Sequence, residues 1–337
     1  MSTGASAAEP AESGRRIMGV LDLPPDRGDG PGPPLPHGRR IDLPDRGVTF
    51  VREVEGPADA PTLLLLHGWW ASGGLNWFQA FEPLSRHFNI VAPDLRGHGR
   101  GIRSRRRFRL ADCADDTAAL LDELGTGPVI AVGYSMGGPV SQLLWRRHRD
   151  KVAGLVMCAT SHGFVPVMRE RFIFTTAMAS LAGTTRLGEL AGHMPTRLAE
   201  RLAPAWAGQW PAPAGPTRPS TLQRWAAAEM RRHDLTQVME AGIAIGNYNA
   251  RRWIGQVDVP TAVVLTELDR AIAPGRQQAM ADAIPGATVF PVPDGHVACA
   301  RGVWLPGLLG ACRDVADREG QSRQAATISA SRPGATA

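Results

Sequence analysis

The pentapeptide Gly133-Tyr134-Ser135-Met136-Gly137 follows directly on the apolar run 128–132 and constrains the fold more than any other segment. It predicts a strand that stops at Ser135 and turns at once into a helix. So sharp a turn forces the serine into a strained backbone conformation, and the residues two places before and after it must be small. Gly133 and Gly137 meet that demand. The N-terminus of the following helix would favour negative charge beside the serine.

Short apolar runs of β type alternate with helical patterns on both sides of this turn. We expect strands at 48–54, 62–66, 90–92, 129–132, 152–158, 262–266 and 288–292, and helices at 75–81, 116–124, 136–145, 276–284 and 303–316. This alternation is typical of an α/β fold with a doubly wound, mostly parallel sheet and helices on both faces. With 337 residues, 43% of them hydrophobic, the chain is long enough to bury such a core.

The alternation breaks between residues 161 and 253, where Gly and Pro separate helical segments and no strand-like run occurs. We interpret 161–253 as an inserted helical lid, which divides the core into residues 39–160 and 254–318. Adaptable apolar side chains in such a lid would suit an apolar pocket beneath it, or would simply hold the lid helices together. These side chains are Met168, Met178, Met194, Met230, Met239, Trp206, Trp210, Trp225 and Trp253.

Both ends of the chain differ in composition from the middle. Residues 1–38 are rich in Pro, Gly, Ala and Asp, and residues 319–337 look similar, so we expect both segments to be disordered. The N-terminus lacks the continuous apolar stretch of a secretory signal, and nowhere do about 18 apolar residues run together. We therefore expect a cytoplasmic protein with no membrane span and with reduced, buried cysteines: Cys113, Cys158, Cys299 and Cys312.

The net charge of the chain is +5. Arginine supplies nearly all of the positive charge, because Lys151 is the only lysine. The densest cluster holds six arginines interrupted by a single aromatic residue, Phe108. Nucleic-acid grooves usually combine positive charge with several stacking aromatics. We therefore favour a solvated loop over a docking surface for nucleic acid or anionic lipid, and we expect no nucleic-acid partner. The cluster comprises Arg100, Arg103, Arg105, Arg106, Arg107 and Arg109.

A serine at such a turn needs a base that accepts its proton and an acid that orients the base. Asp269 and His296 each come just after a predicted strand late in the chain. Because the carboxyl ends of parallel strands share one edge of a sheet, we expect Ser135, Asp269 and His296 to meet there as nucleophile, acid and base. Glu267 is the main alternative to Asp269 as the acid.

A negatively charged oxygen at this site would need two converging N–H donors. The backbone of Met136, directly after the serine, is expected to supply one, and the backbone of Trp69 the other. Gly68 would let the substrate approach closely. Trp70 and Trp77 are predicted to line the substrate pocket, although either could belong to the core.

The remaining histidines show no metal-ligand pairing such as His-Glu-x-x-His, so we expect neither a metal nor an organic cofactor. We interpret His67 as a structural hydrogen-bonding residue rather than a base. Five others are expected on surfaces or in loops: His37, His87, His148, His193 and His233.

Four segments together resemble the α/β-hydrolase family of the lipase and esterase type, with eight strands and a lid inserted after the sixth. The resemblance covers about residues 40–318. In this family the segment that corresponds to Asp94-Leu95-Arg96-Gly97-His98-Gly99 is a structural turn, so Asp94 and His98 are given no catalytic role. The family often has Gly three residues before the acid, where this chain has Thr266. The segments are His67-Gly68-Trp69-Trp70, Asp94-Leu95-Arg96-Gly97-His98-Gly99, Gly133-Tyr134-Ser135-Met136-Gly137-Gly138, and Leu268-Asp269-Arg270 with Gly295-His296.

The resemblance implies a serine hydrolase that cleaves a carboxylic ester of an apolar small molecule through an acyl-enzyme intermediate. Carbon-carbon bond hydrolases and acyltransferases use the same triad, and non-catalytic ligand-binding proteins also occur on this fold, so these remain alternatives. A serine at position 135 argues against the relatives that open epoxides or remove halogens, because those use a carboxylate. The oligomeric state is not indicated.

Overall fold

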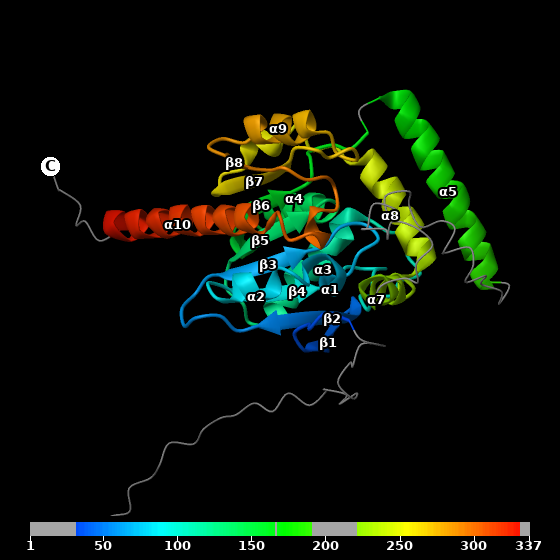
Figure 1. Cartoon of the computed structure of the whole chain (residues 1–337), viewed down its shortest axis with the longest axis horizontal. Coiled ribbons are helices and arrows are strands. Elements are labelled where there is room, and N and C mark those ends of the chain that lie inside the picture. The colour runs from blue at the N-terminus through cyan, green and yellow to red at the C-terminus, as the bar shows by residue number, and fades with distance from the viewer. Residues whose placement is uncertain (1–31, 166, 191–220, 331–337) are drawn as a thin grey trace, which may run out of the picture.

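A single sheet of eight strands organises the molecule (Figure 1). The computed structural model describes residues 32–165, 167–190 and 221–330. Neighbouring strands follow the order β1-β2-β4-β3-β5-β6-β7-β8. The pairs β1·β2 and β2·β4 are antiparallel and all other pairs are parallel, which confirms the predicted mostly parallel sheet. The strands are β1 (Gly38–Leu43), β2 (Gly47–Val54), β3 (Thr62–Leu66), β4 (Asn89–Pro93), β5 (Val129–Tyr134), β6 (Val152–Cys158), β7 (Thr261–Thr266) and β8 (Thr288–Val292).

The apolar runs predicted the strands closely, with one omission. Strands β3, β6 and β8 have the expected bounds, and β2, β4, β5 and β7 differ by one or two residues. Strand β1 was not expected, because only Ile41 and Leu43 of its six residues are buried and it lies at the sheet edge. A half-buried edge strand carries a weak hydrophobic signal.

Helices cover both faces of the sheet (Figure 1). Alternate residues of β3 point to opposite faces: Leu64 and Leu66 pack with α3, α4 and α9, whereas Leu63 and Leu65 pack with α1, α2 and α10. The two apolar layers therefore bury the central strands completely. These helices are α1 (Gly73–Trp77), α2 (Phe81–Ser85), α3 (Leu110–Glu123), α4 (Gly137–Arg147), α9 (Pro274–Ala283) and α10 (Leu305–Ala330).

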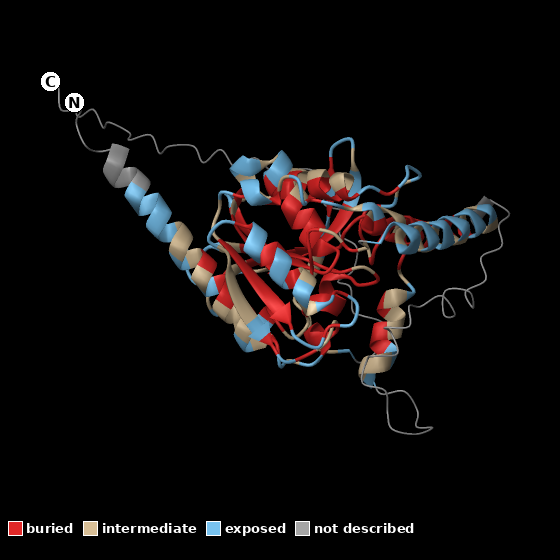
Figure 2. Cartoon of the chain, turned by 90° about the horizontal axis from the view of Figure 1, so that it is seen from above, coloured by how far each residue is buried: buried red, intermediate tan, exposed pale blue. Residues whose placement is uncertain are grey.

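Three helices differ clearly from the prediction, whereas α4 and α9 differ by only one or two residues at each end. The helix expected at 75–81 is two short helices, and the first starts early because the Ser72 side chain caps it by accepting the Leu75 N–H. Helix α3 begins at Leu110, six residues earlier than expected. Helix α10 continues to Ala330, so the prediction of a disordered tail is wrong for residues 319–330. Figure 2 shows this end of α10 projecting with an exposed surface, where an ion pair between Glu319 and Arg323 supports it.

Three helices occupy the described part of the chain between β6 and β7: α5 (Met168–Leu190), α7 (Thr221–Met230) and α8 (Leu235–Asn247). Helices α5 and α8 pack against each other beside the sheet, and the outer side of α5 is exposed (Figures 1 and 2). Residues 1–31, 191–220 and 331–337, with Met194, Trp206, Trp210 and His193, lie outside the described residues. No described helix is both long and apolar enough to cross a membrane.

All four cysteines are buried, and none forms a disulfide. Burial raises the pKa of the Cys299 thiol to about 12. Desolvation acts in the same direction on the other three thiols. The expectation of buried cysteines is confirmed.

Candidate active site

Ser135 lies where β5 ends and α4 begins, at the carboxyl edge of the sheet. Its φ of +50° is in the left-handed region, which is strained for a residue with a side chain. A Cβ at Gly133 would lie 2.4 Å from the Gly137 carbonyl oxygen, and one at Gly137 would lie 2.1 Å from the Leu66 carbonyl oxygen. The turn therefore admits only glycine at both positions.

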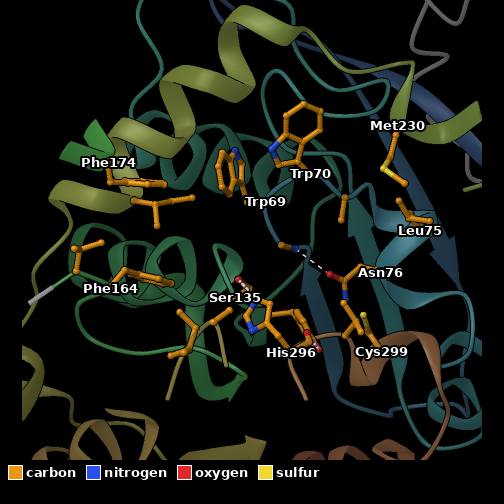
Figure 3. A pocket seen from close by; sticks show the side chains of 18 residues that line it. Trp69, Trp70, Leu75, Asn76, Ser135, Phe164, Phe174, Met230, His296 and Cys299 are labelled. Carbon is orange, nitrogen blue, oxygen red and sulfur yellow. Dashed lines mark hydrogen bonds between the residues drawn. The ribbon is translucent and has the colours of Figure 1, made fainter. Parts of the chain in front are cut away.

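Ser135, His296 and Asp269 form one chain of hydrogen bonds (Figure 3 labels the first two). The serine Oγ lies 3.0 Å from His296 Nε2, and His296 Nδ1 lies 2.8 Å from Asp269 Oδ2. The loops after β5, β7 and β8 bring these side chains together. With its Nδ1 proton directed at the carboxylate, the imidazole can accept the serine proton at Nε2.

The Asp269 carboxylate is buried and firmly held. Oδ1 accepts the backbone N–H groups of Ala271 and Ile272, each at 2.8 Å. Oδ2 accepts the Thr266 hydroxyl at 2.9 Å in addition to His296. Glu267, the alternative acid, is exposed. Asp269, and not Glu267, is therefore the carboxylate in contact with His296.

Thr266 replaces the glycine that the family often has, and its hydroxyl also accepts the Gln277 amide at 2.9 Å. Gln277 Oε1 in turn accepts the Thr266 backbone N–H at 3.0 Å. Sequence reasoning missed Thr266 and Gln277 as support for Asp269. A hydroxyl three residues before a candidate acid was the only local signal.

The loop that carries His296 is tied to its neighbours. The Tyr134 hydroxyl donates to the His296 carbonyl oxygen at 2.6 Å, so the residue beside the serine also holds the histidine backbone. The Leu268 N–H donates to the Asp294 carbonyl oxygen at 3.0 Å, which joins the acid loop to the histidine loop. Both contacts restrict how far the three groups can separate.

The two residues expected to supply backbone N–H donors, Met136 and Trp69, come from different elements beside the serine. Met136 precedes α4, and Trp69 follows β3. Within the described residues, neither N–H has a hydrogen-bond partner. The loop between β3 and α1 is anchored because the Gly68 N–H donates to Asn76 Oδ1 at 3.0 Å. Trp70 has a φ of +59°, a strained conformation for so large a residue.

A cavity of about 240 Å³ opens beside Ser135 and His296 (Figure 3). Trp69 and Trp70 form one wall, and the Trp69 indole N–H is fixed by the Val238 carbonyl oxygen of α8 at 2.7 Å. The segment between β6 and β7 supplies further apolar side chains: Phe164, Val165, Phe174, Met230 and Ile245.

Trp77 does not line this cavity, in contrast to Trp70. It is fully buried in the core, where its ring packs against Tyr134 and Trp304. Its position on α1 turns it toward the sheet, so the assignment of Trp77 to the pocket is wrong.

The methionines and tryptophans of residues 161–253 were considered as possible pocket residues. Among those that the structure describes, only Met230 lines the cavity. Trp225 packs on Phe78, and Trp253 stacks on Trp145.

Three histidines are buried behind the Trp69-Trp70 loop. The ring centroids of His67 and His98 lie 5.4 Å apart, as do those of His98 and His233. Burial lowers the pKa of each to about 3, so all three are neutral. His233 lies in the loop between α7 and α8, one of the two expected locations, but it is buried, and its Nδ1 accepts the Gly99 N–H at 2.8 Å.

Two arginines of the predicted cluster fasten the helices after β6 to the core. Arg100 forms a buried ion pair with Glu229 of α7, at 3.0 Å. Arg103 donates to the carbonyl oxygens of Gly97, Gly99 and Arg232. The other arginines, Arg105, Arg106, Arg107 and Arg109, are exposed, as expected for a solvated loop.

The family model described as alpha/beta hydrolase fold matches residues 61–302. The chain is 29% identical over 241 residues to the pimeloyl-[acyl-carrier protein] methyl ester esterase of Chromobacterium violaceum, which covers 71% of this chain and 88% of that protein. It is 42% identical to the magnesium-chelatase 30 kDa subunit of Rhodobacter capsulatus, but over only 26% of this chain and 30% of that subunit.

A solved structure extends the likeness to the whole fold. A hydrolase from Pseudomonas aeruginosa PA01 superposes with a TM-score of 0.61 at 25% sequence identity. The superposition covers 82% of this chain and 96% of that chain.

Proposed function

Because the chain belongs to the alpha/beta hydrolase fold family and is a carboxylic ester hydrolase-like enzyme, we propose that Ser135 cleaves esters of apolar small molecules through an acyl-enzyme intermediate. One observation carries the proposal: the hydroxyl, imidazole and carboxylate are in hydrogen-bond contact, at 3.0 and 2.8 Å. This arrangement suits a nucleophile, a general base and an orienting acid.

In the first step Ser135 Oγ attacks the ester carbonyl carbon while His296 Nε2 takes the hydroxyl proton. The N–H groups of Trp69 and Met136 stabilise the resulting oxyanion. The intermediate then expels the alcohol, which receives the proton from His296. In the second step water attacks the acyl-enzyme, His296 again accepts and returns the proton, and the carboxylic acid leaves. Asp269 stabilises the imidazolium in both steps.

The apolar walls of the cavity support an apolar substrate. We propose that residues 161–253 form a lid, since Phe174, Met230 and Ile245 come from this segment and line the cavity together with core residues. The relative in Chromobacterium violaceum is named as a methyl ester esterase, which supports an ester as the substrate class. The cytoplasmic location stays a prediction.

An activity-based probe tests the nucleophile directly. We expect a fluorophosphonate to label the protein at Ser135 and 4-nitrophenyl esters to be hydrolysed, and Ser135→Ala to abolish both. Ser180→Ala, on the exposed side of α5, is the matched control and should retain both. Hydrolysis by a folded Ser135→Ala protein would rule out this mechanism. Failure of the wild-type protein to react with the probe would favour a ligand-binding protein without catalysis.

The length of the acyl chain tests the apolar cavity. Each buried methylene contributes about 0.8 kcal/mol of transfer free energy, so kcat/KM should rise as the acyl chain of 4-nitrophenyl esters grows from acetate, until the cavity is full. Because the cavity volume is about 240 Å³, we expect the rise in kcat/KM to stop at a short acyl chain. A flat or falling series from the start would contradict an apolar substrate.

A further inference from the structure

Two polar side chains are buried directly behind the Asp269 carboxylate, on the side away from the cavity. Thr266 is the last residue of β7 and is 2% exposed, and Gln277 lies near the start of α9 and is fully buried. In the described part of the chain, the residues that line the active-site cavity include neither of them. Any influence of these side chains on the reaction must therefore act through Asp269.

The direction of the hydrogen bonds between these residues is determined by the Gln277 amide. Its Oε1 accepts the Thr266 backbone N–H at 3.0 Å, and an N–H donor requires the oxygen. Its Nε2 therefore donates to the Thr266 hydroxyl oxygen, at 2.9 Å. The hydroxyl proton is then directed at Asp269 Oδ2, which lies 2.9 Å away and, as a carboxylate oxygen, only accepts.

The Thr266 hydroxyl contacts the same carboxylate oxygen that accepts the His296 imidazole. Oδ1 of Asp269 is held by two backbone N–H groups of its own loop. Oδ2 accepts His296 Nδ1 at 2.8 Å, Thr266 Oγ1 at 2.9 Å and, more distantly, Gln277 Nε2 at 3.4 Å. Apart from the imidazole, these two side chains are the partners of Oδ2 among the described residues, so they determine where this oxygen lies.

Gln277 also fastens both ends of the loop that carries Asp269. Thr266 precedes the loop, and Ile272 follows Asp269 at its other end. Besides its contacts with Thr266, Gln277 Nε2 donates to the Ile272 carbonyl oxygen at 2.8 Å. One side chain of α9 thus holds residues 266–272 from behind, and the carboxylate cannot move far without breaking one of these bonds.

We propose that Thr266 and Gln277 are positioning residues of the active site: Gln277 orients the Thr266 hydroxyl, and this hydroxyl holds the Asp269 oxygen that orients His296. The inference rests on the proposed function of Ser135 and adds two residues to its site. Amide, hydroxyl, carboxylate, imidazole and serine hydroxyl then form one series of hydrogen bonds. A displacement of about 1 Å in a reacting group can slow a reaction about a hundredfold, so the orientation of the acid affects turnover.

Thr266→Val removes the hydroxyl and keeps the shape of the side chain. We expect kcat for a 4-nitrophenyl ester to fall by about tenfold to a hundredfold. KM should stay as in the wild type, because Thr266 does not line the cavity in the described part of the chain. The rate of fluorophosphonate labelling should fall with kcat. Thr266→Ser retains the hydroxyl and should recover most of the wild-type kcat.

Thr261→Val is the matched control, because it is the same exchange at the opposite end of the same strand. Thr261 is also fully buried, and its hydroxyl donates to the Val259 carbonyl oxygen at 3.0 Å. The control therefore loses a buried hydrogen bond without touching Asp269. We expect it to lower the free energy of unfolding in urea while kcat stays as in the wild type.

Gln277→Met tests whether Gln277 acts through Thr266. Methionine has a similar length but neither donates nor accepts as the amide does. The exchange should lower kcat in the wild-type background and have little further effect in the Thr266→Val background, because coupled residues are not additive. Additive losses in the double variant would overturn the role of Gln277 as the group that orients the hydroxyl.

The outcomes separate this inference from the proposed function. Wild-type kcat in a folded Thr266→Val protein would overturn the inference while Ser135 remains the nucleophile. Equal losses in Thr266→Ser and Thr266→Val would also overturn it, because that pattern indicates packing rather than the hydroxyl.

If the wild-type protein hydrolyses no ester, the proposed function fails, and proton NMR tests the positioning separately. The resonance to follow is the downfield signal of His296 Nδ1–H, assigned by its absence in His296→Gln. We expect it to shift or broaden in Thr266→Val and to stay in place in Thr266→Ser and Thr261→Val. An unchanged resonance in Thr266→Val would contradict the inference.

Discussion

At the residue scale, environment rather than residue type decides which carboxylate contacts His296. Asp269 and Glu267 are two positions apart in the same loop. Asp269 accepts five hydrogen bonds, from two backbone N–H groups, a hydroxyl, the Gln277 amide and the imidazole, whereas Glu267 is exposed. Such a preorganised carboxylate keeps one imidazole orientation without reorganisation during the reaction.

The buried histidines predict how stability depends on pH. Burial, together with the nearby His98 and Arg103, lowers the pKa of His233 from its ordinary 6.5 to about 3. Between these values the unfolded chain binds a proton that the folded chain does not, so the free energy of unfolding falls as pH falls from 6.5. Each such histidine contributes a slope of up to about 1.4 kcal/mol per pH unit.

His233→Asn keeps an oxygen for the Gly99 N–H and removes the titrating ring. We expect it to reduce the loss of stability between pH 7 and pH 4.5, measured by urea unfolding at several pH values. The exposed His37→Asn should leave the slope as in the wild type. Identical slopes for His233→Asn and the wild type would show that His233 stays accessible to protons in the folded protein.

At the element scale, the loop between β4 and α3 joins the helices after β6 to the sheet. Arg100 reaches Glu229 of α7, and the Phe108 N–H donates to Glu240 of α8 at 2.8 Å. Gln237 donates to the carbonyl oxygens of Ser104 and Arg106 from the same helix. The side of the cavity formed by Met230 and Ile245 is thus positioned by this loop.

Breaking the buried pair of Arg100 and Glu229 should loosen this connection. Glu229→Gln leaves the guanidinium buried beside a neutral amide, and the loss of one partner of a buried pair costs about 3–5 kcal/mol. Urea unfolding measures it, and replacement of both residues by apolar ones should recover much of the loss. Glu82→Gln, in an exposed pair with Arg86, is the control and should change little. Equal free energies of unfolding for Glu229→Gln and the wild type would mean that this ion pair does not stabilise the fold.

At the scale of the whole molecule, the arginines of the cluster fall into two groups. Arg100 and Arg103 are engaged in contacts between elements, whereas Arg105, Arg106 and Arg107 are exposed. Exposed charges far from a reacting group contribute little to stability or turnover. The net charge of +5 therefore gives no evidence by itself of an anionic partner.

Replacing the exposed arginines tests this division. The triple variant Arg105→Gln, Arg106→Gln, Arg107→Gln should hydrolyse 4-nitrophenyl esters at the wild-type rate and unfold at about the same urea concentration. Binding to heparin at low salt, if present, should weaken while turnover persists. A large loss of turnover in a folded triple variant would instead place these side chains on the path of the substrate.

The sequence by itself was sufficient for seven of the eight strands and for the convergence of Ser135, Asp269 and His296. A continuous apolar run is a local feature of the sequence, and it indicates a strand that is buried on both faces. The carboxyl ends of parallel strands lie at one edge of the sheet, which brings the residues after them together. The glycines on either side of the serine, Gly133 and Gly137, indicated the turn, because a Cβ at either position would overlap the backbone.

Only the tertiary structure decided the details that depend on neighbours distant in sequence. It placed Trp77 in the core and Trp70 at the cavity, buried His233, and brought Gln277 to Thr266. The direction of a side chain and the partner of a polar atom depend on which elements pack together. No local periodicity encodes those contacts, since they form only when the chain has folded.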